Sequence, residues 1–136
     1  MIFSLISTSK KILDTDEVES VIIPTLQGEI QVLPNHLAVL GVTQPGILKV
    51  QYIGRETNYA LGAGIYEVDE NGVRVIADMV EAEWTVNAES ITKKKEEASA
   101  FMAQARKDGL QNSAEYLAAE EETLKLTALE QLAKRN

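Results

Sequence analysis

The sequence contains no cysteine, so it can form neither a disulfide bond nor a thiolate metal site. Cations are also scarce, because 13 lysine and arginine residues stand against 21 aspartate and glutamate residues, for a formal net charge of −8. This balance argues against nucleic-acid binding, since phosphate contacts require clustered cations that release counterions. It also argues against direct adhesion to an anionic membrane surface.

Long apolar runs are missing as well. No run approaches the roughly 20 residues that a helix needs to cross a bilayer, so no direct membrane insertion is expected. Residues 1–7 carry no basic segment, and the polar residues 7–11 follow too soon for a secretory signal peptide. With 45% hydrophobic and 25% charged residues in 136 positions, the chain should fold. The composition predicts an acidic, soluble, intracellular protein.

Proline and glycine are unevenly distributed, which divides the chain near Trp84. All three prolines precede Trp84, and Gly109 is the only glycine after it. Before Trp84, β-branched residues and turn residues alternate at short intervals. This pattern predicts strands at residues 18–25, 29–33, 47–52, 57–61, 65–68 and 73–77. Many short strands without intervening helices indicate a β-sandwich, which we assign to residues 1–84.

Residues 85–136 have a helical composition, rich in alanine, glutamate, lysine, glutamine and leucine. Asn87 is the expected N-cap of a first helix, and Asn112 with Glu115 resembles a capping box for a second. One apolar stripe is predicted on each helix: Ile91, Ala98, Met102 and Ala105, then Leu117, Leu124, Ala128 and Leu132. A short connection predicts an antiparallel hairpin. Its apolar stripes are narrow, so the hairpin buries little area by itself. We expect it to pack against the sandwich, against a partner, or alternately against both.

Residues that could support catalysis are isolated in this sequence. His36 is the only histidine and has no nearby acidic partner, so a metal site or a base–nucleophile pair is not expected there. Gly62 and Gly64 lack the following helix of a phosphate loop, and a strand kink or close packing explains them better. The lysines 93–95 and glutamates 120–122 are interpreted as solvated helix faces. We therefore predict a non-enzymatic protein with no catalytic residue, metal or cofactor.

An ordered set of motifs is similar to that of the epsilon subunits of F-type ATP synthases. Residues 28–36 (GEIQVLPNH) and 46–50 (GILKV) correspond to the family's G-E-L-G-I-(L/Y)-P-x-H and G-x-(L/I)-(R/K)-(V/I) blocks. Residues 62–68 (GAGIYEV) and 71–78 (NGVRVIAD) correspond to S-G-G-(F/I)-x-E-V and N-x-V-T-V-L-A-D. Size, domain order and the glycine between the helices also agree, so the resemblance covers essentially the whole chain.

The resemblance implies a non-catalytic rotor subunit of the central stalk, which couples ion-driven c-ring rotation through the gamma subunit to ATP synthesis. The sandwich would bind gamma and the c-ring, and the hairpin would be a candidate regulator of hydrolysis through the alpha and beta subunits. The implied c-ring contacts are Gln27, Gly28, Glu29, Ile30 and His36. The implied location is the cytoplasmic face of the bacterial plasma membrane, with the chloroplast thylakoid as the alternative. The absence of an arginine-rich transit segment before Phe3 disfavours the mitochondrial delta subunit, which shares this architecture.

Two regulatory features of the family are altered in this sequence. Some bacterial relatives bind ATP through an (I/L)-D-x-x-R-A motif, and the corresponding residues here are Val86, Asn87, Ser90 and Ile91. Serine replaces the arginine that would meet phosphate, so we expect no ATP binding through this motif. The second helix carries more acidic than basic residues. Its repulsion from an acidic segment of beta predicts weak or absent inhibition of hydrolysis.

Two other classes of protein fit part of the sequence. A stand-alone interaction adaptor, with a sandwich and a coiled-coil hairpin, would explain the fold equally well but not the ordered motifs. A small ligand-binding or enzymatic sandwich would require a deep pocket with a paired acid/base or metal constellation.

Overall fold

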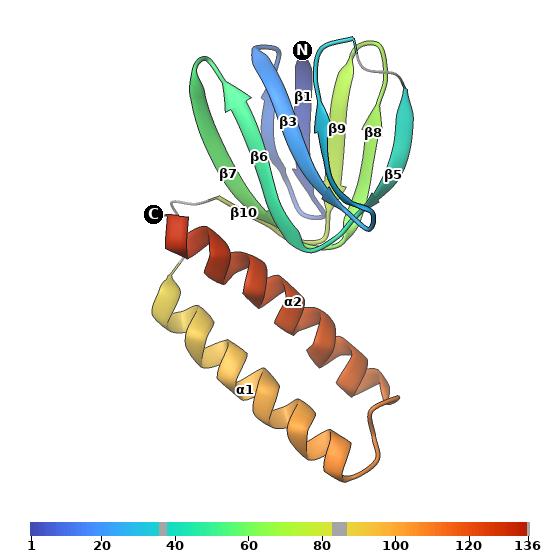
Figure 1. Ribbon diagram of the computed structural model, residues 1–136, viewed down its shortest axis with the longest axis vertical. Helices are drawn as coiled ribbons and strands as arrows, with labels where there is room; N and C mark the ends of the chain where they lie inside the picture. The colour runs from blue at the N-terminus through green and yellow to red at the C-terminus, as the bar shows by residue number, and fades with distance from the viewer. Residues whose placement is uncertain (36–37, 83–86, 136) are drawn as a thin grey trace.

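The computed structural model describes residues 1–35, 38–82 and 87–135, and consists of a β-sandwich followed by a two-helix hairpin (Figure 1). This arrangement confirms the predicted fold class. The predicted domain boundary between residues 84 and 85 lies outside the described residues, as does Trp84. The last described strand ends at Ala82 and the first helix begins at Ala88.

The described residues form ten strands in one folded sheet of order β10-β7-β6-β3-β5-β8-β9-β1-β2, with β4 paired to β3. Among these pairs only β1 and β9 run parallel. The strands are β1 (Ile2–Ser7), β2 (Lys11–Thr15), β3 (Val18–Thr25), β4 (Gly28–Val32), β5 (Val39–Thr43), β6 (Gly46–Tyr52), β7 (Arg55–Leu61), β8 (Gly64–Val68), β9 (Gly72–Ala77) and β10 (Val80–Ala82).

Strand β3 joins the two layers of the sandwich. It pairs with β6 along most of its length, but with β5 only through Thr25 and Thr43. The sheet therefore turns at this end of β3, and the strands on either side of the turn face each other across the core (Figure 1). Side chains alternate between the two faces of each strand, so one face of every long strand enters the core.

The sandwich core is made mainly of aliphatic side chains, together with Phe3 and the rings of Tyr59 and Tyr66. Phe3, Leu5, Ile23, Leu48 and Leu61 are fully buried in it. Burying such a side chain contributes about 1.5–3 kcal/mol. This cluster draws on both layers, and therefore holds them together.

The six strands predicted from the sequence correspond to β3, β4, β6, β7, β8 and β9, each within one or two residues of its end. The sequence interpretation did not include β1, β2, β5 or β10. The close-packing interpretation of Gly64 is confirmed, because a Cβ there would stand 2.0 Å from the carbonyl oxygen of Ile76 on the neighbouring strand.

Helix α1 (Ala88–Lys107) begins directly after the predicted cap, Asn87, and ends two residues before Gly109. Asn87 Oδ1 accepts hydrogen bonds from two backbone amides of the first turn, at 3.0 and 3.2 Å. Gly109 has a φ of 71°, which allows the amide of Leu110 to turn back and donate to the carbonyl of Ala105 at 2.8 Å. Both ends of the helix are therefore set by local sequence.

Helix α2 (Ala114–Arg135) has a different cap from the predicted one. The hydroxyl of Ser113 accepts a hydrogen bond from the amide of Tyr116 at 3.2 Å. The predicted capping box of Asn112 and Glu115 is therefore wrong. Because α2 begins at Ala114, the N-cap position is that of Ser113, whose side chain can reach the free amides of the first turn. Asn112 lies one residue before the cap position.

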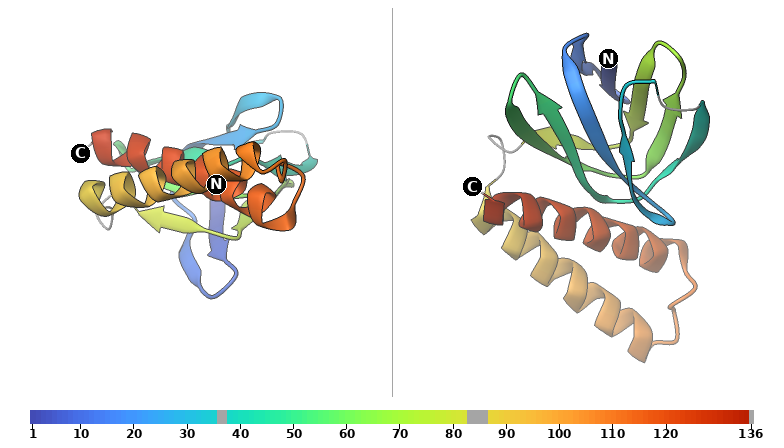
Figure 2. Two further views of the ribbon diagram at one scale, coloured as in Figure 1. Left: turned by 90° about the horizontal axis from the view of Figure 1, so that it is seen from below. Right: turned by 45° about the horizontal axis from the view of Figure 1, so that its top comes forward.

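The two helices lie antiparallel (Figures 1 and 2). Near the connecting loop, Arg106 Nε donates to the hydroxyl of Tyr116 at 2.8 Å. Towards the other end, Lys95 Nζ stands 3.4 Å from a carboxylate oxygen of Glu130. These two contacts bracket the interface and confirm the predicted hairpin.

The predicted stripe of α2 is partly wrong. Ala128 and Leu132 are buried as expected, but Leu117 and Leu124 are 53% and 52% exposed. Tyr116 and Leu126 are buried instead. The reason is that α2 packs on two neighbours, α1 and the sandwich, so their positions, and not a single stripe read from the helical period, decide which of its residues are buried.

Candidate functional site

The described residues contain no group of three or more side chains suited to holding a metal ion. Within the same part of the chain, neither helix combines the length and the hydropathy that crossing a bilayer requires. His36 lies outside the described residues.

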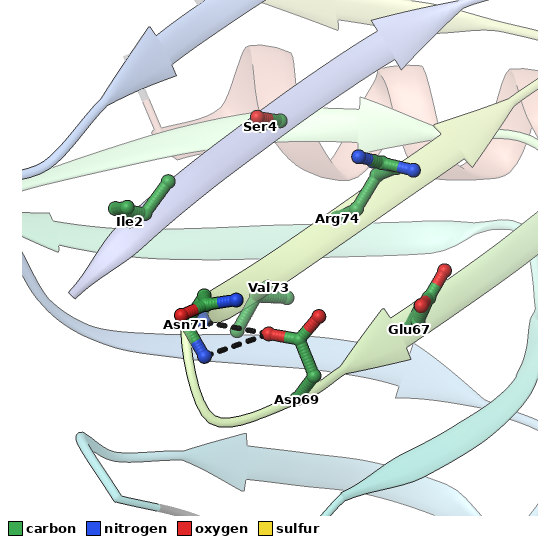
Figure 3. Close-up of a pocket in the computed structure, with 8 residues that line it drawn as sticks. Ile2, Ser4, Glu67, Asp69, Asn71, Val73 and Arg74 are labelled. Carbon is green, nitrogen blue, oxygen red and sulfur yellow. Dashed lines mark hydrogen bonds between the residues drawn. The ribbon is translucent and has the colours of Figure 1, made fainter.

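A small hollow of about 150 Å³ lies beside the turn between β8 and β9 (Figure 3). The Asp69 carboxylate accepts hydrogen bonds from the backbone amides of Asn71 and Gly72, at 2.8 and 3.0 Å. It therefore braces its own turn. The hollow is smaller than the roughly 300–1,000 Å³ of typical ligand pockets, and we assign it a structural role.

The turn between β3 and β4 carries four of the predicted c-ring contacts. Gln27, Gly28 and Glu29 are exposed, whereas Ile30 is half-buried and packs against the sandwich core. Thr25 braces this turn, because its hydroxyl donates to the carbonyl of Gly28 and accepts from the amide of Gln27. The tip of the turn is thus a firm, exposed surface.

Glu29 has a loose ionic partner in this turn. Its carboxylate stands 3.8 Å from Lys49 Nζ, and the Glu29 side chain is 56% exposed. An exposed pair at this distance contributes little to stability, so the carboxylate remains available to another cation.

The fifth predicted contact belongs to a different region of the chain. Pro34 and Asn35, which precede His36, line a hollow together with Asn71 and Gly72. Strand β4 separates them from the Gln27 turn. The neighbours of His36 that are described therefore lie at the opposite end of the sandwich from that turn.

A second exposed surface covers the outside of the β5-β8-β9-β1 layer, and we call it the outer apolar row. Ladder pairs place Val42 beside Ile65, Ile65 beside Ile76, and Ile76 beside Ile6. Leu40 adds to one end, two residues along β5. Leu40, Val42 and Ile65 are 71%, 51% and 48% exposed. An exposed apolar row of this kind is a candidate interaction surface.

Positions of the altered ATP motif have structural roles in the hairpin. Val86 lies outside the described residues, and Asn87 is committed to capping α1. Ser90 is exposed, and Ile91 is buried. The absence of ATP binding through these residues stays a prediction.

The hairpin is docked on the sandwich through the C-terminal half of α2. Ala128 and Leu132 pack against Ile47 of β6 and Ala60 of β7 in a small buried cluster. Met79 and Leu129 cover its edges. Figure 2 shows α2, and not α1, facing the sandwich. Of the arrangements that the sequence left open, the hairpin here takes the one that leans on the sandwich.

An ion pair completes this contact. Lys125 Nζ stands 2.8 Å from a carboxylate oxygen of Asp78, which follows β9. Gly62 leaves the space for it, because a Cβ at that position would stand 2.0 Å from Asp78 Oδ1 and 3.1 Å from the Lys125 side chain. The sequence did not point to this pair, since its partners come from different domains.

The docked hairpin should loosen at alkaline pH. The hydrogen bond to Asp78 raises the pKa of Lys125 above its ordinary 10.5, and nearby carboxylates add to this, while partial burial opposes it. A cation with a raised folded-state pKa stabilises the fold below about 10.5, and this contribution is lost as the pH rises through the folded-state value.

Thermal unfolding of the wild type and of Lys125→Met, measured from pH 8 to 11.5, tests this expectation. The wild type should be more stable by about 0.5–1 kcal/mol at pH 8, and the two should converge above pH 10.5. Lys94→Met, at an exposed position of α1, is the matched control and should differ little from the wild type throughout. A constant difference across the range would contradict the prediction.

Comparison with known proteins places the chain in a family. The family model described as the β-sandwich domain of the ATP synthase delta/epsilon chain matches residues 1–83. An ATP synthase epsilon chain of Synechococcus sp. (strain RCC307) is 32% identical over 120 residues, which cover 88% of this chain and 87% of that relative. An epsilon chain of Rhodopseudomonas palustris (strain BisA53) is 39% identical over 77 residues, 57% of this chain and 56% of the relative.

A solved structure extends the likeness to the whole fold. A chain in the cryo-EM structure of the mitochondrial ATP synthase of Euglena gracilis, with OSCP, F1 and c-ring, matches with a TM-score of 0.82 at 26% identity. The match covers 96% of this chain and 79% of that chain. Since the family model spans more than half of the residues and the Synechococcus relative extends into the hairpin, this chain belongs to the delta/epsilon family of ATP synthase subunits.

Proposed function

We propose that the chain acts as a non-catalytic rotor subunit of an F-type ATP synthase. In this role it links the c-ring to the gamma subunit, so that ion-driven rotation reaches catalytic sites on other subunits. The observation that carries the proposal is the outer apolar row, which this sandwich leaves at least partly exposed on the outside of its β5-β8-β9-β1 layer. A rotor connection requires a rigid body with two separate contact surfaces.

The outer apolar row is the proposed contact for gamma. Val42, Ile65, Ile76 and Ile6 form one line across four strands, and Leu40 extends it. Burying these side chains against an apolar surface of the partner would stabilise the complex by about 25 cal/mol for each Å² of apolar area removed from water.

The β3–β4 turn is the proposed contact for the c-ring. Gln27, Gly28 and Glu29 are exposed there, and the Glu29 carboxylate suits a basic loop. In this role the protein would be held peripherally at the membrane through its partners, and we place it on the cytoplasmic face of a bacterial plasma membrane.

The hairpin is the proposed regulatory element. Its docked position depends on a small apolar cluster and on the Lys125–Asp78 pair, so its release has a limited cost. The excess of carboxylates on α2 makes strong inhibition through an acidic segment of beta an unfavourable route.

Affinity capture from native membranes tests the proposed function. A tagged full-length chain should recover gamma together with the alpha, beta and c subunits, identified by mass spectrometry. Recovery of an unrelated protein without any synthase subunit would contradict the proposal and favour a stand-alone adaptor.

Site-directed cross-linking tests the c-ring contact. Because the sequence contains no cysteine, a cysteine introduced at a chosen position is the only thiol that a cross-linking reagent can modify. A photoreactive maleimide on Gln27→Cys should cross-link to subunit c in the assembled complex. The same group on Asn71→Cys, at the opposite end of the sandwich, should give at most a tenth of that product. Equal yields from the two positions, or no cross-link to c from Gln27, would show that this turn is not the contact.

A further inference from the structure

A cavity of about 410 Å³ opens on the side of the sandwich where β2 faces β6 and β7. Its walls are the aliphatic side chains of Leu13 and Val50 and the rings of Tyr52 and Tyr59. The volume falls within the roughly 300–1,000 Å³ of ligand pockets, and the lining has their usual character, apolar with a few polar groups. We infer that this cavity binds a small carboxylate amphiphile, of the chemical class of a medium-chain fatty acid.

The charge at the rim identifies the polar group of the ligand. Arg55 lines the cavity and is exposed, and among the described residues no hydrogen bond or ion pair involves its guanidinium. None of the three nearby carboxylates forms an ion pair with Arg55 among the described residues, and Glu56, the next residue of β7, does not line the cavity. Glu17 accepts from the hydroxyl of Tyr52 at 3.3 Å, and Glu19 accepts from the amide of Gly54 at 3.3 Å. A guanidinium on an apolar rim suits a carboxylate, which it can hold with two parallel hydrogen bonds.

Ile53, in the same turn as Arg55, also lines the cavity and has an unfavourable backbone conformation. Ile53 has a φ of 47° and is 59% exposed. The turn between β6 and β7 would be better served by asparagine, aspartate or glycine at this position, and a β-branched residue with positive φ is strained. Such strain is found at ligand clamps, and an apolar side chain at the mouth of an apolar cavity can cover a hydrocarbon tail.

This site is separate from the surfaces proposed for the rotor. The outer apolar row lies on the outside of the other layer, and the Gln27 turn lies at the far end of β6 from the turn that holds Ile53. Ligand binding here and binding to gamma or the c-ring are therefore tested independently.

Decanoate is the probe, titrated calorimetrically into the full-length chain below its micelle concentration. We expect saturable one-to-one binding, with amide chemical shifts changing at Leu13, Tyr52 and Tyr59. Arg55→Gln should weaken binding about tenfold through loss of the charge-assisted contact. Arg74→Gln, an exposed arginine on β9, is the matched control and should bind as the wild type does. Decanol, which lacks the carboxylate, should bind the wild type and Arg55→Gln equally.

Ile53→Asn separates a ligand-binding role from a structural one. This substitution relieves the strained φ, so the melting temperature should rise by about 3 °C, while the affinity for decanoate should fall about fivefold. A purely structural isoleucine would not show gain of stability and loss of affinity together. The inference is overturned if the wild type shows no saturable binding up to about 1 mM, a very weak affinity. It is also overturned if Arg55→Gln and Arg74→Gln behave alike, or if the shifts map elsewhere.

Discussion

Replacing Ile65 with aspartate should lower the affinity for purified gamma at least 100-fold, while the free chain stays folded and its melting temperature falls by only about 3–5 °C. Ile65 is half exposed at the centre of the outer apolar row, between Val42 and Ile76. In the free chain a carboxylate there points into water. In an apolar interface the same carboxylate loses its hydration without gaining a partner, which costs several kcal/mol. A 100-fold loss corresponds to only about 2.8 kcal/mol.

The measurement is a titration of gamma with the wild type, with Ile65→Asp and with Leu110→Asp. Leu110 is similarly exposed, at 53%, but belongs to the hairpin loop, so its variant should bind gamma as the wild type does. Equal affinity of all three chains for gamma would show that the outer apolar row is not the contact for gamma. If the wild type itself does not bind gamma, the proposed function fails instead, so the two failures are distinguishable.

Local sequence predicted the parts of the fold that depend on local signals. The central strands were identified by β-branched alternation, and the ends of α1 by Asn87 and Gly109. Strand β5 was missed because Gly41 interrupts it, and glycine is unfavourable in a strand. The structure explains this glycine, since a Cβ there would stand 2.4 Å from the ring of Tyr66 on β8. The need for glycine at this position comes from a side chain on a neighbouring strand, so the residues around Gly41 in the sequence do not indicate it.

Strand β1 was missed for another reason. Ile2–Ser7 alternates between core residues such as Phe3 and Leu5 and outward residues such as Ile6. Outward isoleucines weaken the contrast between the two faces, so the period of two is hard to recognise. Its parallel pairing with β9 is also a long-range choice that no short window reveals.

The candidate sites likewise divide into those that the sequence indicates and those that depend on contacts between distant residues. Motif resemblance located the Gln27–Ile30 turn, which the structure presents as an exposed, braced turn. The outer apolar row could not be predicted, because it is assembled by register from four strands, and the sequence does not say which apolar face is left uncovered. The Lys125–Asp78 ion pair joins the two domains, and for the same reason it could not be predicted from the sequence.

Replacing Leu132 with aspartate should release the hairpin from the sandwich without unfolding the sandwich. Leu132 is fully buried and packs with Ala128 against Ile47 and Ala60. Removing a buried leucine costs about 2–5 kcal/mol, and an unpaired carboxylate in the same place adds a desolvation cost. The Lys125–Asp78 pair is partly exposed and contributes at most about 1 kcal/mol, too little to keep the helix in place.

Amide hydrogen exchange distinguishes release from global unfolding. In Leu132→Asp, protection of α2 should fall about 100-fold or more, while the amides of β1 and β9 stay as protected as in the wild type. Gln131→Asp places the same charge on the exposed neighbour and should leave α2 protected. Unchanged protection of α2 in Leu132→Asp would mean that this cluster does not hold the hairpin. Loss of protection in β1 and β9 as well would mean that the sandwich depends on the docked hairpin, and that the two domains unfold as one unit.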